Sequence, residues 1–206
     1  FSQADMVKSY EYFSKALLIF EKNNDLAGLG YTYQSLVRLY QSQENYPKAL
    51  EISKKVLQIR EDTKNIRGQI SSLQEIATIL EDMKDYVGAQ NQLDRARALA
   101  LSINDNISIS EIDLNLSSIL LRMKNYGEAL NYCNKALITA DKNGNERLLE
   151  KIYLQYGKIY FATNEYALSE DYLLKVIERA NKSGFIEPLE EAYYYLFLIY
   201  DNRGSL

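Results

Sequence analysis

Apolar and polar residues alternate along the chain with the period of an α-helix. Apolar side chains recur at spacings of three and four residues, as at Leu36, Leu39 and Tyr40 and again at Leu50 and Leu57. This spacing is typical of helices that bury one face. Short polar segments interrupt the pattern at regular intervals. We therefore predict ten amphipathic helices, which cover residues 4–22, 27–42, 46–62, 67–83, 86–102, 107–123, 126–142, 146–162, 166–182 and 187–202.

The same pattern returns every forty residues. Tyrosines follow one another at this spacing, and a small residue stands three positions after each of them. The tyrosines are Tyr46, Tyr86, Tyr126 and Tyr166, and the small residues are Ala49, Ala89, Ala129 and Ser169. Met6 and Ser9 continue the series upstream, and Leu206 falls in the tyrosine column downstream. A fixed period of this length indicates a repeat protein in which each unit is one pair of helices.

The period also sets the domain organisation that we expect. A first helix over 4–22 is followed by repeats 26–65, 66–105, 106–145 and 146–185 and by a half repeat 186–206. No linker or low-complexity tract interrupts the series, so a single stacked unit over 1–206 is expected. Because Leu206 stands where another second helix would begin, we expect this stretch to be a piece of a longer protein.

Two kinds of turn are expected between the helices. The turn inside a unit is short and polar, as at 42–45, which makes the two helices antiparallel neighbours. A longer polar turn is expected to close each unit, as at 142–145. Both prolines, Pro47 and Pro188, are expected among the first residues of a helix, where a missing N–H costs little.

Paired small residues link the repeat to a known family. A small residue in the first helix of each unit is followed twelve positions later by a small residue in the second helix, and the pairs are Val37 with Ala49, Ala77 with Ala89, Ser117 with Ala129, and Gly157 with Ser169. This pattern resembles the tetratricopeptide repeat family. The usual repeat of that family is six residues shorter and has a proline near its end, which is absent here. The chain is thus similar to the forty-residue variety.

Asp113 departs from the family pattern. It stands in a column that otherwise holds Tyr33, Leu73, Tyr153 and Tyr193. Burying a carboxylate without a donor is costly. The sequence leaves three interpretations of Asp113 open, namely a kink, a polar contact inside the stack or a contact with a ligand.

The resemblance implies an all-α, right-handed superhelix of about ten antiparallel-paired helices, whose concave surface is lined by first helices and binds peptides or partner helices. It implies no catalysis. Similar arrays occur in non-catalytic parts of bacterial regulators, so we expect a protein- or peptide-binding module in the regulatory or sensing region of a bacterial signal-transduction or transcription-regulating protein. A constitutive scaffold or adaptor for the assembly of a protein complex is the alternative.

The family's geometry assigns residues of the first helices to the concave groove. These candidates are Gln34, Arg38, Gln74, Thr78, Leu114, Leu121, Arg122, Lys151, Leu154, Lys158, Phe161, Tyr194 and Leu198. Exposed apolar groups in the later half suggest an anchor pocket. Our hypothesis is that Phe161 and Tyr194 contact a docked peptide, while Lys151, Lys158 and Arg122 pair with its acidic groups. The alternative is that these side chains pack against neighbouring repeats.

Composition removes many kinds of chemistry. The chain has no histidine and one cysteine, which excludes histidine-based catalytic triads, histidine metal sites and disulfide frameworks. We expect Cys133 to be a small buried residue. No catalytic, metal or cofactor site is expected. The net charge of −4 disfavours direct contact with nucleic acid.

The sequence also bears on location and assembly. No run approaches the length of a membrane span, and the single cysteine suits a reducing compartment, so a cytoplasmic protein without membrane insertion is expected. Exposed ends of a repeat array favour self-association. A homodimer through the repeat ends is therefore possible.

Overall fold

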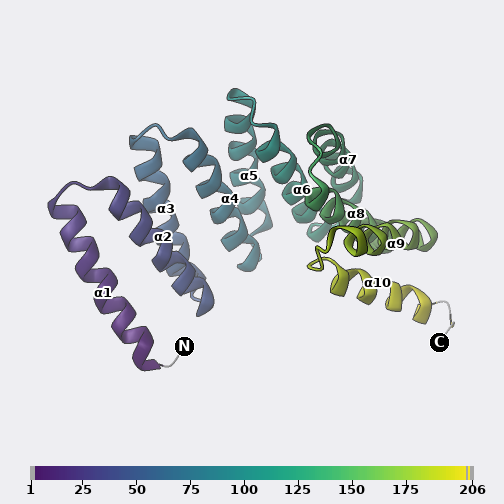
Figure 1. Cartoon of the computed structure of the whole chain (residues 1–206), viewed down its shortest axis with the longest axis horizontal. Helices are drawn as coiled ribbons and strands as arrows, with labels where there is room; N and C mark the ends of the chain where they lie inside the picture. The colour runs from purple at the N-terminus through teal and green to yellow at the C-terminus, as the bar shows by residue number, and fades with distance from the viewer. Residues whose placement is uncertain (1–2, 203, 205–206) are drawn as a thin grey trace. The chain divides into compact units, whose positions relative to one another are not determined.

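The computed structural model folds the chain into helices and connecting turns (Figure 1). It describes residues 3–202 and 204, with side chains from Lys8 onward except Tyr10. Within this part there are ten helices and no strand, and the helices are α1 (Gln3–Lys22), α2 (Leu26–Ser42), α3 (Tyr46–Asp62), α4 (Ile66–Asp82), α5 (Tyr86–Ser102), α6 (Asn106–Arg122), α7 (Tyr126–Asn143), α8 (Glu146–Ala162), α9 (Tyr166–Ser183) and α10 (Leu189–Asn202). The predicted all-α class and the ten predicted helices are confirmed. The Met6 side chain and Leu206, which extended the repeat columns, lie outside the described residues.

Three predicted helices have the observed bounds, and the largest difference is at α10. This helix begins at Leu189, two residues later than predicted. Pro188 precedes the helix, and its carbonyl oxygen accepts the Ala192 N–H. The prediction that Pro188 lies inside the helix is therefore wrong, whereas Pro47 does lie in the first turn of α3.

Most turns share one geometry, and among the described residues the expected longer turn between units is found only at 184–188. Three residues connect the helices both inside a unit, as at 43–45, and between units, as at 63–65. In each of these turns the middle residue has a positive φ, and such residues recur every twenty positions from Asn24 to Gly204. The forty-residue period therefore consists of two 17-residue helices and two three-residue turns over much of the chain.

Polar residues at the ends of the turns fix where the helices begin. Each accepts a hydrogen bond from a backbone N–H three residues later, which satisfies one of the free donors of the first turn. These capping residues are Asp25, Asn45, Asn65, Asp85, Asp105, Asn125 and Asn145. Glu165 stands at the equivalent position before α9 and makes no such bond.

The helices form two compact units, residues 1–96 and 97–206, with α5 crossing the boundary. In the first unit α1 packs on α2, α2 on α3 and α3 on α4. Val37, Ala49 and Ile79 are fully buried there and pack against Tyr40 and Leu50. The predicted single stack over 1–206 stays a prediction.

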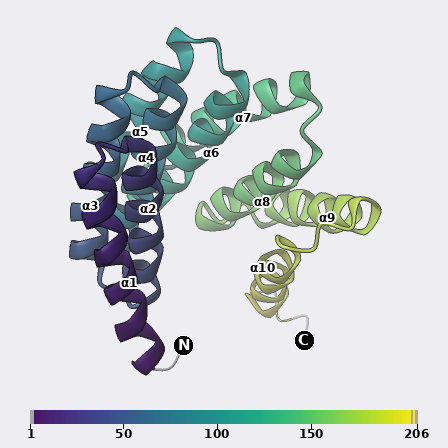
Figure 2. The same ribbon diagram turned by 60° about the vertical axis from the view of Figure 1, so that its left-hand side comes forward.

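The second unit contains two helix pairs, α6 with α7 and α8 with α9, followed by α10. Figure 2 shows α8 and α9 side by side. Their contact depends on Gly157, whose carbonyl oxygen accepts a 2.7 Å hydrogen bond from the Ser169 hydroxyl. An added Cβ at Gly157 would lie 2.6 Å from Leu173 Cδ2. The small-residue pair therefore permits the close approach of these two helices.

The role of Asp113 is resolved by an ion pair inside the second unit. Its side chain is buried, with 1% exposed, and its Oδ1 lies 2.5 Å from Arg97 Nε. Arg97 Nη2 also donates to Asp113 Oδ2 at 3.3 Å. Of the three interpretations, the polar contact inside the stack is the one that the structure supports.

Cys133 is fully buried, as predicted, in the core that α7 and α8 share. Tyr156, Tyr160 and Tyr172 stack beside this core, with ring centroids of Tyr156 and Tyr172 4.6 Å apart. Among the described helices, none combines the length and the apolar character that crossing a membrane requires.

Candidate functional site

The first helices of the second unit lie next to one another, because α8 contacts both α6 and α10. Between them is a cavity of about 230 Å³, which we call the α6–α8–α10 groove. Its lining consists of Leu114, Asn115, Ser118, Lys151, Leu154, Gln155, Lys158, Glu187, Pro188 and Glu191. The groove therefore lies on the side of the unit where the sequence predicted a binding surface.

Helical spacing places these side chains together. Leu114 and Ser118 are four residues apart on α6, and Leu154 and Lys158 occupy the same columns forty residues later on α8. Residues at this spacing share one helix face. The structure thus brings four predicted residues, Leu114, Lys151, Leu154 and Lys158, into one groove.

The floor of the groove is apolar and packed. Leu154 is only 8% exposed and belongs to a core cluster with Leu173 and Leu196. The sequence predicted an exposed side chain here, which is wrong because the neighbouring helices cover most of it. Gln155 is also buried, and its Nε2 donates to Ser117 Oγ at 3.2 Å. A ligand in the groove would therefore contact a packed apolar surface whose buried amide already has a hydrogen-bond partner.

The rim of the groove carries paired charges. Lys151 Nζ lies 3.2 Å from Glu187 Oε1, and Lys158 Nζ lies 2.6 Å from Glu191 Oε1. Both lysines were predicted to pair with acidic groups of a ligand, and the structure shows that each already has a carboxylate partner. The pairing with Glu187 was not predictable from the sequence, because it depends on how α8 and the start of α10 approach each other. An acidic ligand group would have to exchange with these glutamates.

The predicted aromatic anchors lie outside the groove lining. Phe161 packs edge-on against Tyr195, with ring centroids 5.2 Å apart. Tyr194 also packs edge-on against Tyr195, with ring centroids 5.7 Å apart. Phe161 also contacts Tyr166. Burial raises the pKa of the Tyr195 hydroxyl, and the nearby Glu191 carboxylate adds to this shift. Phe161 is thus half-buried in an aromatic contact, whereas Tyr194 is exposed.

The remaining candidates of the second unit have separate surroundings. Leu121 is half-buried against the core of α7 and α8. Arg122 is exposed at the end of α6, and Leu198 is half-buried on α10. None of the three lines the α6–α8–α10 groove.

Four candidates belong to the first unit. Gln34 is half-buried and lines a cavity of about 500 Å³ with Tyr31 and Arg60. Arg38 is exposed on α2. On α4, Gln74 is half-buried, and its carbonyl oxygen accepts a hydrogen bond from the exposed Thr78. The structure therefore does not gather these four residues into one pocket.

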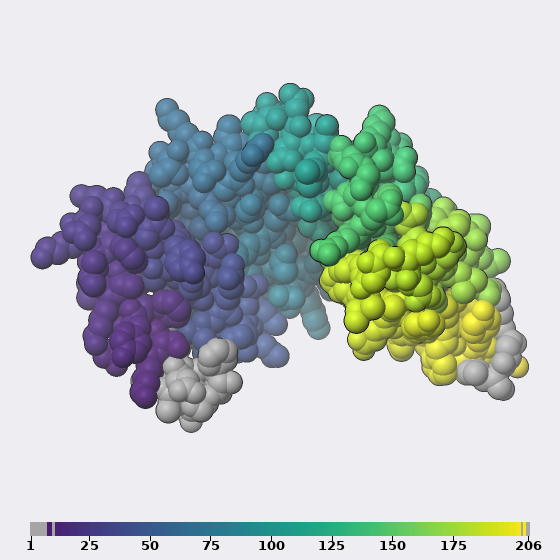
Figure 3. All heavy atoms as spheres, in the orientation of Figure 1, coloured from purple at the N-terminus to yellow at the C-terminus, as the bar shows by residue number. Residues whose placement is uncertain are grey.

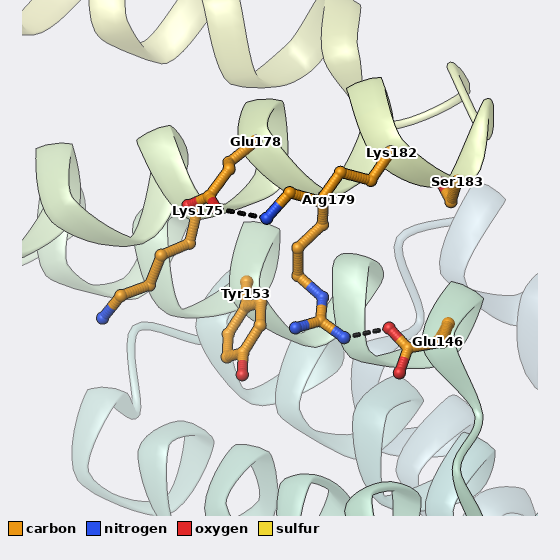
Figure 4. A pocket seen from close by; sticks show the side chains of 7 residues that line it. All are labelled: Glu146, Tyr153, Lys175, Glu178, Arg179, Lys182 and Ser183. Carbon is orange, nitrogen blue, oxygen red and sulfur yellow. Dashed lines mark hydrogen bonds and ion pairs between the residues drawn. The ribbon is translucent and has the colours of Figure 1, made fainter.

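A polar pocket between α8 and α9 was not found from the sequence. The pocket has a volume of about 550 Å³. Figure 4 shows the side chains that line it, which are Glu146, Tyr153, Lys175, Glu178, Arg179, Lys182 and Ser183. The Arg179 guanidinium forms an ion pair with Glu146 and lies 5.5 Å from the centre of the Tyr153 ring. Lys182 pairs with Glu178 at 2.6 Å. Both cations therefore have carboxylate partners within the protein, as is usual for charged side chains on the surface of packed helices.

Thiol and metal chemistry can be judged from burial and from the grouping of side chains. Cys133 has no exposed surface, and burial raises the pKa of its thiol to about 12, so the reactive thiolate is not formed near neutral pH. Among the described residues no group of three or more His, Cys, Asp or Glu side chains could hold a metal ion.

Comparison with known proteins gives the same fold. The structure is similar to that of aspartyl phosphate phosphatase F from Bacillus subtilis, with a TM-score of 0.82, 15% sequence identity, and coverage of 98% of this chain and 55% of that one. It is also similar to a signal transduction ATPase (STAND) protein with a tetratricopeptide repeat sensor from Pyrococcus horikoshii, with a TM-score of 0.75, 21% identity, and coverage of 91% and 30%.

A third similar structure is the Rap conjugation gene regulator of the plasmid pLS20, solved in complex with the Phr* peptide. Its TM-score is 0.68 at 17% identity, and the match covers 88% of this chain and 55% of the regulator. The chain therefore spans about a third to about half of these three proteins. A search of curated protein sequences found no significant match.

Two family models match the sequence itself, and both are described as tetratricopeptide repeat. One matches residues 29–63 and the other residues 108–182, which together make up more than half of the chain. The matched segments include α2 with α3 in the first unit and most of α6 to α9 in the second. The paired small residues, the helix pairs and both matches lead to one conclusion: the chain belongs to the tetratricopeptide repeat family.

Proposed function

We propose that this chain is a non-catalytic module that binds a protein or peptide, and that the α6–α8–α10 groove is its binding site. The observation that carries the proposal is the groove itself, which has an apolar floor at Leu114 and Leu154 and a charged rim at Lys151 and Lys158. Ligand sites commonly combine an apolar surface with a few polar groups that fix orientation.

The size and charge of the groove define the ligand. A volume of about 230 Å³ accommodates one or two side chains and not a whole folded domain, so the ligand is a peptide segment. An aliphatic side chain would rest on Leu154, and a neighbouring carboxylate would replace Glu187 or Glu191 beside a lysine. Such an exchange is accessible at Lys151, because its ion pair with Glu187 is exposed and exposed pairs contribute little, about 0–1 kcal/mol.

We further propose that the module is the regulatory or sensing part of a larger cytoplasmic protein of a bacterium. Support comes from the similar structures, one of which is a sensor of a signal transduction ATPase and another a regulator bound to a peptide. Peptide binding would then shift the population of conformations of the attached output region. The inert Cys133 and the absence of histidine support a non-catalytic role.

The test is a selection of random 12-residue peptides on the wild-type protein, followed by calorimetric titration of the enriched peptides. Ser118→Arg places a long cation in the groove, where Ser118 is half-buried. Asn131→Arg makes a similar change on the exposed surface of α7 and serves as the matched control. We expect Ser118→Arg to weaken binding at least about tenfold, which corresponds to about 1.4 kcal/mol.

In the same titrations, Asn131→Arg should leave the affinity within about twofold of wild type. Equal affinities of both variants would show that the peptides bind elsewhere. A selection that enriches no peptide would also contradict the proposal.

A further inference from the structure

Helix α10 presents aromatic side chains to solvent. Tyr193 is 55% exposed, Tyr194 56% and Phe197 52%. With Glu187, Glu190 and Glu191 they line a shallow hollow of about 580 Å³, and we call these six residues the acidic aromatic patch. The surface of α10 is the yellow region of Figure 3. Three large exposed aromatic groups on one short helix are unusual on a surface without a partner.

The forty-residue repeat allows the patch on α10 to be compared with the same positions of α8. Forty residues earlier, the equivalent positions are Tyr153 and Gly157 of α8, and both contact α9. The Tyr153 ring lies 6.0 Å from that of Tyr172, and Gly157 bonds to Ser169. By the repeat, the face of α10 that carries Tyr193 and Phe197 is equivalent to the face of α8 on which α9 packs.

Phe197 changes what can pack there. The other first helices hold a small buried residue in this column, at Val37, Ala77, Ser117 and Gly157. The contact of α9 on α8 is so close that even an added Cβ at Gly157 would meet Leu173 at 2.6 Å. A phenyl ring at this position keeps a helix of the α9 type at a distance. The patch thus fits a partner that offers a recess or a flexible apolar side chain to Phe197.

Charge identifies the chemistry of that partner. Three glutamates border the aromatic groups, and among the described residues no basic side chain lines the hollow. Glu187 and Glu191 each form an ion pair with one lysine of α8. Glu190 is exposed and forms no ion pair within the described part of the chain. The aromatic faces and the carboxylates both attract cations. A second copy of this chain would bring carboxylates against carboxylates, which disfavours self-association through the patch.

We propose that the acidic aromatic patch docks a basic amphipathic helix of a partner protein. Aliphatic side chains of that helix would pack on Tyr194 and Phe197, and its lysines or arginines would lie beside Glu187 and Glu190. This surface is distinct from the α6–α8–α10 groove, although the two share Glu187 and Glu191 at their border. The proposal does not depend on peptide binding in the groove.

The probe is a fluorescein-labelled 18-residue peptide of leucine and lysine, with leucines at helical spacing on one face. Its binding to the whole 206-residue chain is measured by fluorescence anisotropy at low and at moderate salt. Phe197→Ala and Glu190→Lys are each expected to raise the Kd at least about fivefold. A peptide in which glutamates replace the lysines should bind at least about tenfold more weakly than the probe.

Two control variants separate the patch from unspecific attraction. Glu128→Lys makes the same charge change on the exposed surface of α7, and Ile138→Ala removes an exposed apolar side chain from the same helix. Both should leave the Kd within about twofold. Circular dichroism checks that each variant keeps its helical content.

Three results would overturn the proposal. Glu128→Lys could weaken the probe as much as Glu190→Lys, which would indicate attraction to the net charge alone. The glutamate peptide could bind as tightly as the lysine peptide, which would exclude charge recognition. Sedimentation could reveal a dimer that Phe197→Ala dissociates, which would make a second copy the occupant.

Discussion

At the scale of single residues, the buried pair of Asp113 and Arg97 replaces an aromatic contact by an electrostatic one. Tyr153 occupies the equivalent position of the next unit and packs on Tyr172. Asp113 instead receives two hydrogen bonds from Arg97. A buried carboxylate of this kind adds little net stability when it is paired, but removing its partner is costly.

Removal of the arginine side chain should therefore destabilise the protein strongly. Arg97→Met is expected to lower the free energy of unfolding by about 3–5 kcal/mol, because Asp113 stays buried without its cation. Adding Asp113→Leu should recover more than half of this loss, since leucine already occupies the column at Leu73. Urea denaturation measures both values.

Arg95→Met is the control for this pair, because Arg95 forms a more exposed ion pair with Glu61 at 3.4 Å. Its cost should stay below about 1 kcal/mol. Equal losses in the Arg95 and Arg97 variants would contradict the assignment of a buried pair.

A second residue-scale prediction concerns Glu75 on α4. Burial raises the pKa of its carboxyl, and attraction to Arg60 and Arg38 opposes this shift without cancelling it. Its Oε2 is buried without a hydrogen-bond partner in the described structure. Because the folded-state pKa lies above the unfolded value, stability is lost as the pH rises through the interval between the two values.

Glu75→Gln removes this ionisation and should raise the melting temperature at pH 7 but not at pH 3.5, where the carboxyl is protonated in both states. Thermal denaturation followed by circular dichroism at both pH values tests this difference. Glu51→Gln removes an equal charge from an exposed i,i+4 pair with Lys55 and should change the melting temperature little at either pH. A melting temperature of Glu75→Gln below wild type at pH 7 would show that attraction to the arginines outweighs burial.

At the scale of elements, the spacing of α8 and α9 depends on the absence of a side chain at Gly157. Gly157→Ala should lower the free energy of unfolding by about 1–2 kcal/mol, because the new methyl group meets the fully buried Leu173 and this overpacking exceeds the gain in helix propensity. Chemical denaturation measures the change. Gly127→Ala on α7 is the matched control, since no atom lies within 4 Å of its added Cβ.

The control variant should be as stable as wild type or more stable by at most about 1 kcal/mol. A stabilising Gly157→Ala would mean that α8 and α9 can move apart at little cost.

The helices were predictable from the sequence because the apolar period and the capping residues act locally. Asn45, for example, ends a turn and begins α3 through a bond to the Lys48 N–H only three residues away. The turns were predicted less well, since they depend on a positive φ at residues as different as Glu44, Lys64 and Gly144. Side-chain identity alone does not reveal that conformation.

The site was only partly predictable, because it depends on distances between helices. Leu114, Lys151, Leu154 and Lys158 were expected on one surface from their columns, and the structure places them around one cavity. The exposure of Leu154 and the pairing of Lys151 with Glu187 depend on how closely α8 and α10 approach. Local periodicity carries no information on that approach.

At the scale of the whole molecule, the account rests on a division of roles within the second unit. Small residues on both helices of a pair, such as Gly157 on α8 and Ser169 on α9, let the two helices approach, and other side chains of the first helices line the groove. The α6–α8–α10 groove is built from such first helices. Binding should therefore affect α6, α8 and α10 and leave the outward residues of α7 and α9 unchanged.

The most direct measurement is the change in backbone amide NMR shifts when a peptide from the selection is added to the wild-type chain. Binding in the α6–α8–α10 groove predicts the largest shift changes at Ser118, Lys151 and Lys158, with small changes at Asn131 on α7 and Leu174 on α9. Largest changes on α7 and α9, with unaffected amides around the groove, would contradict it.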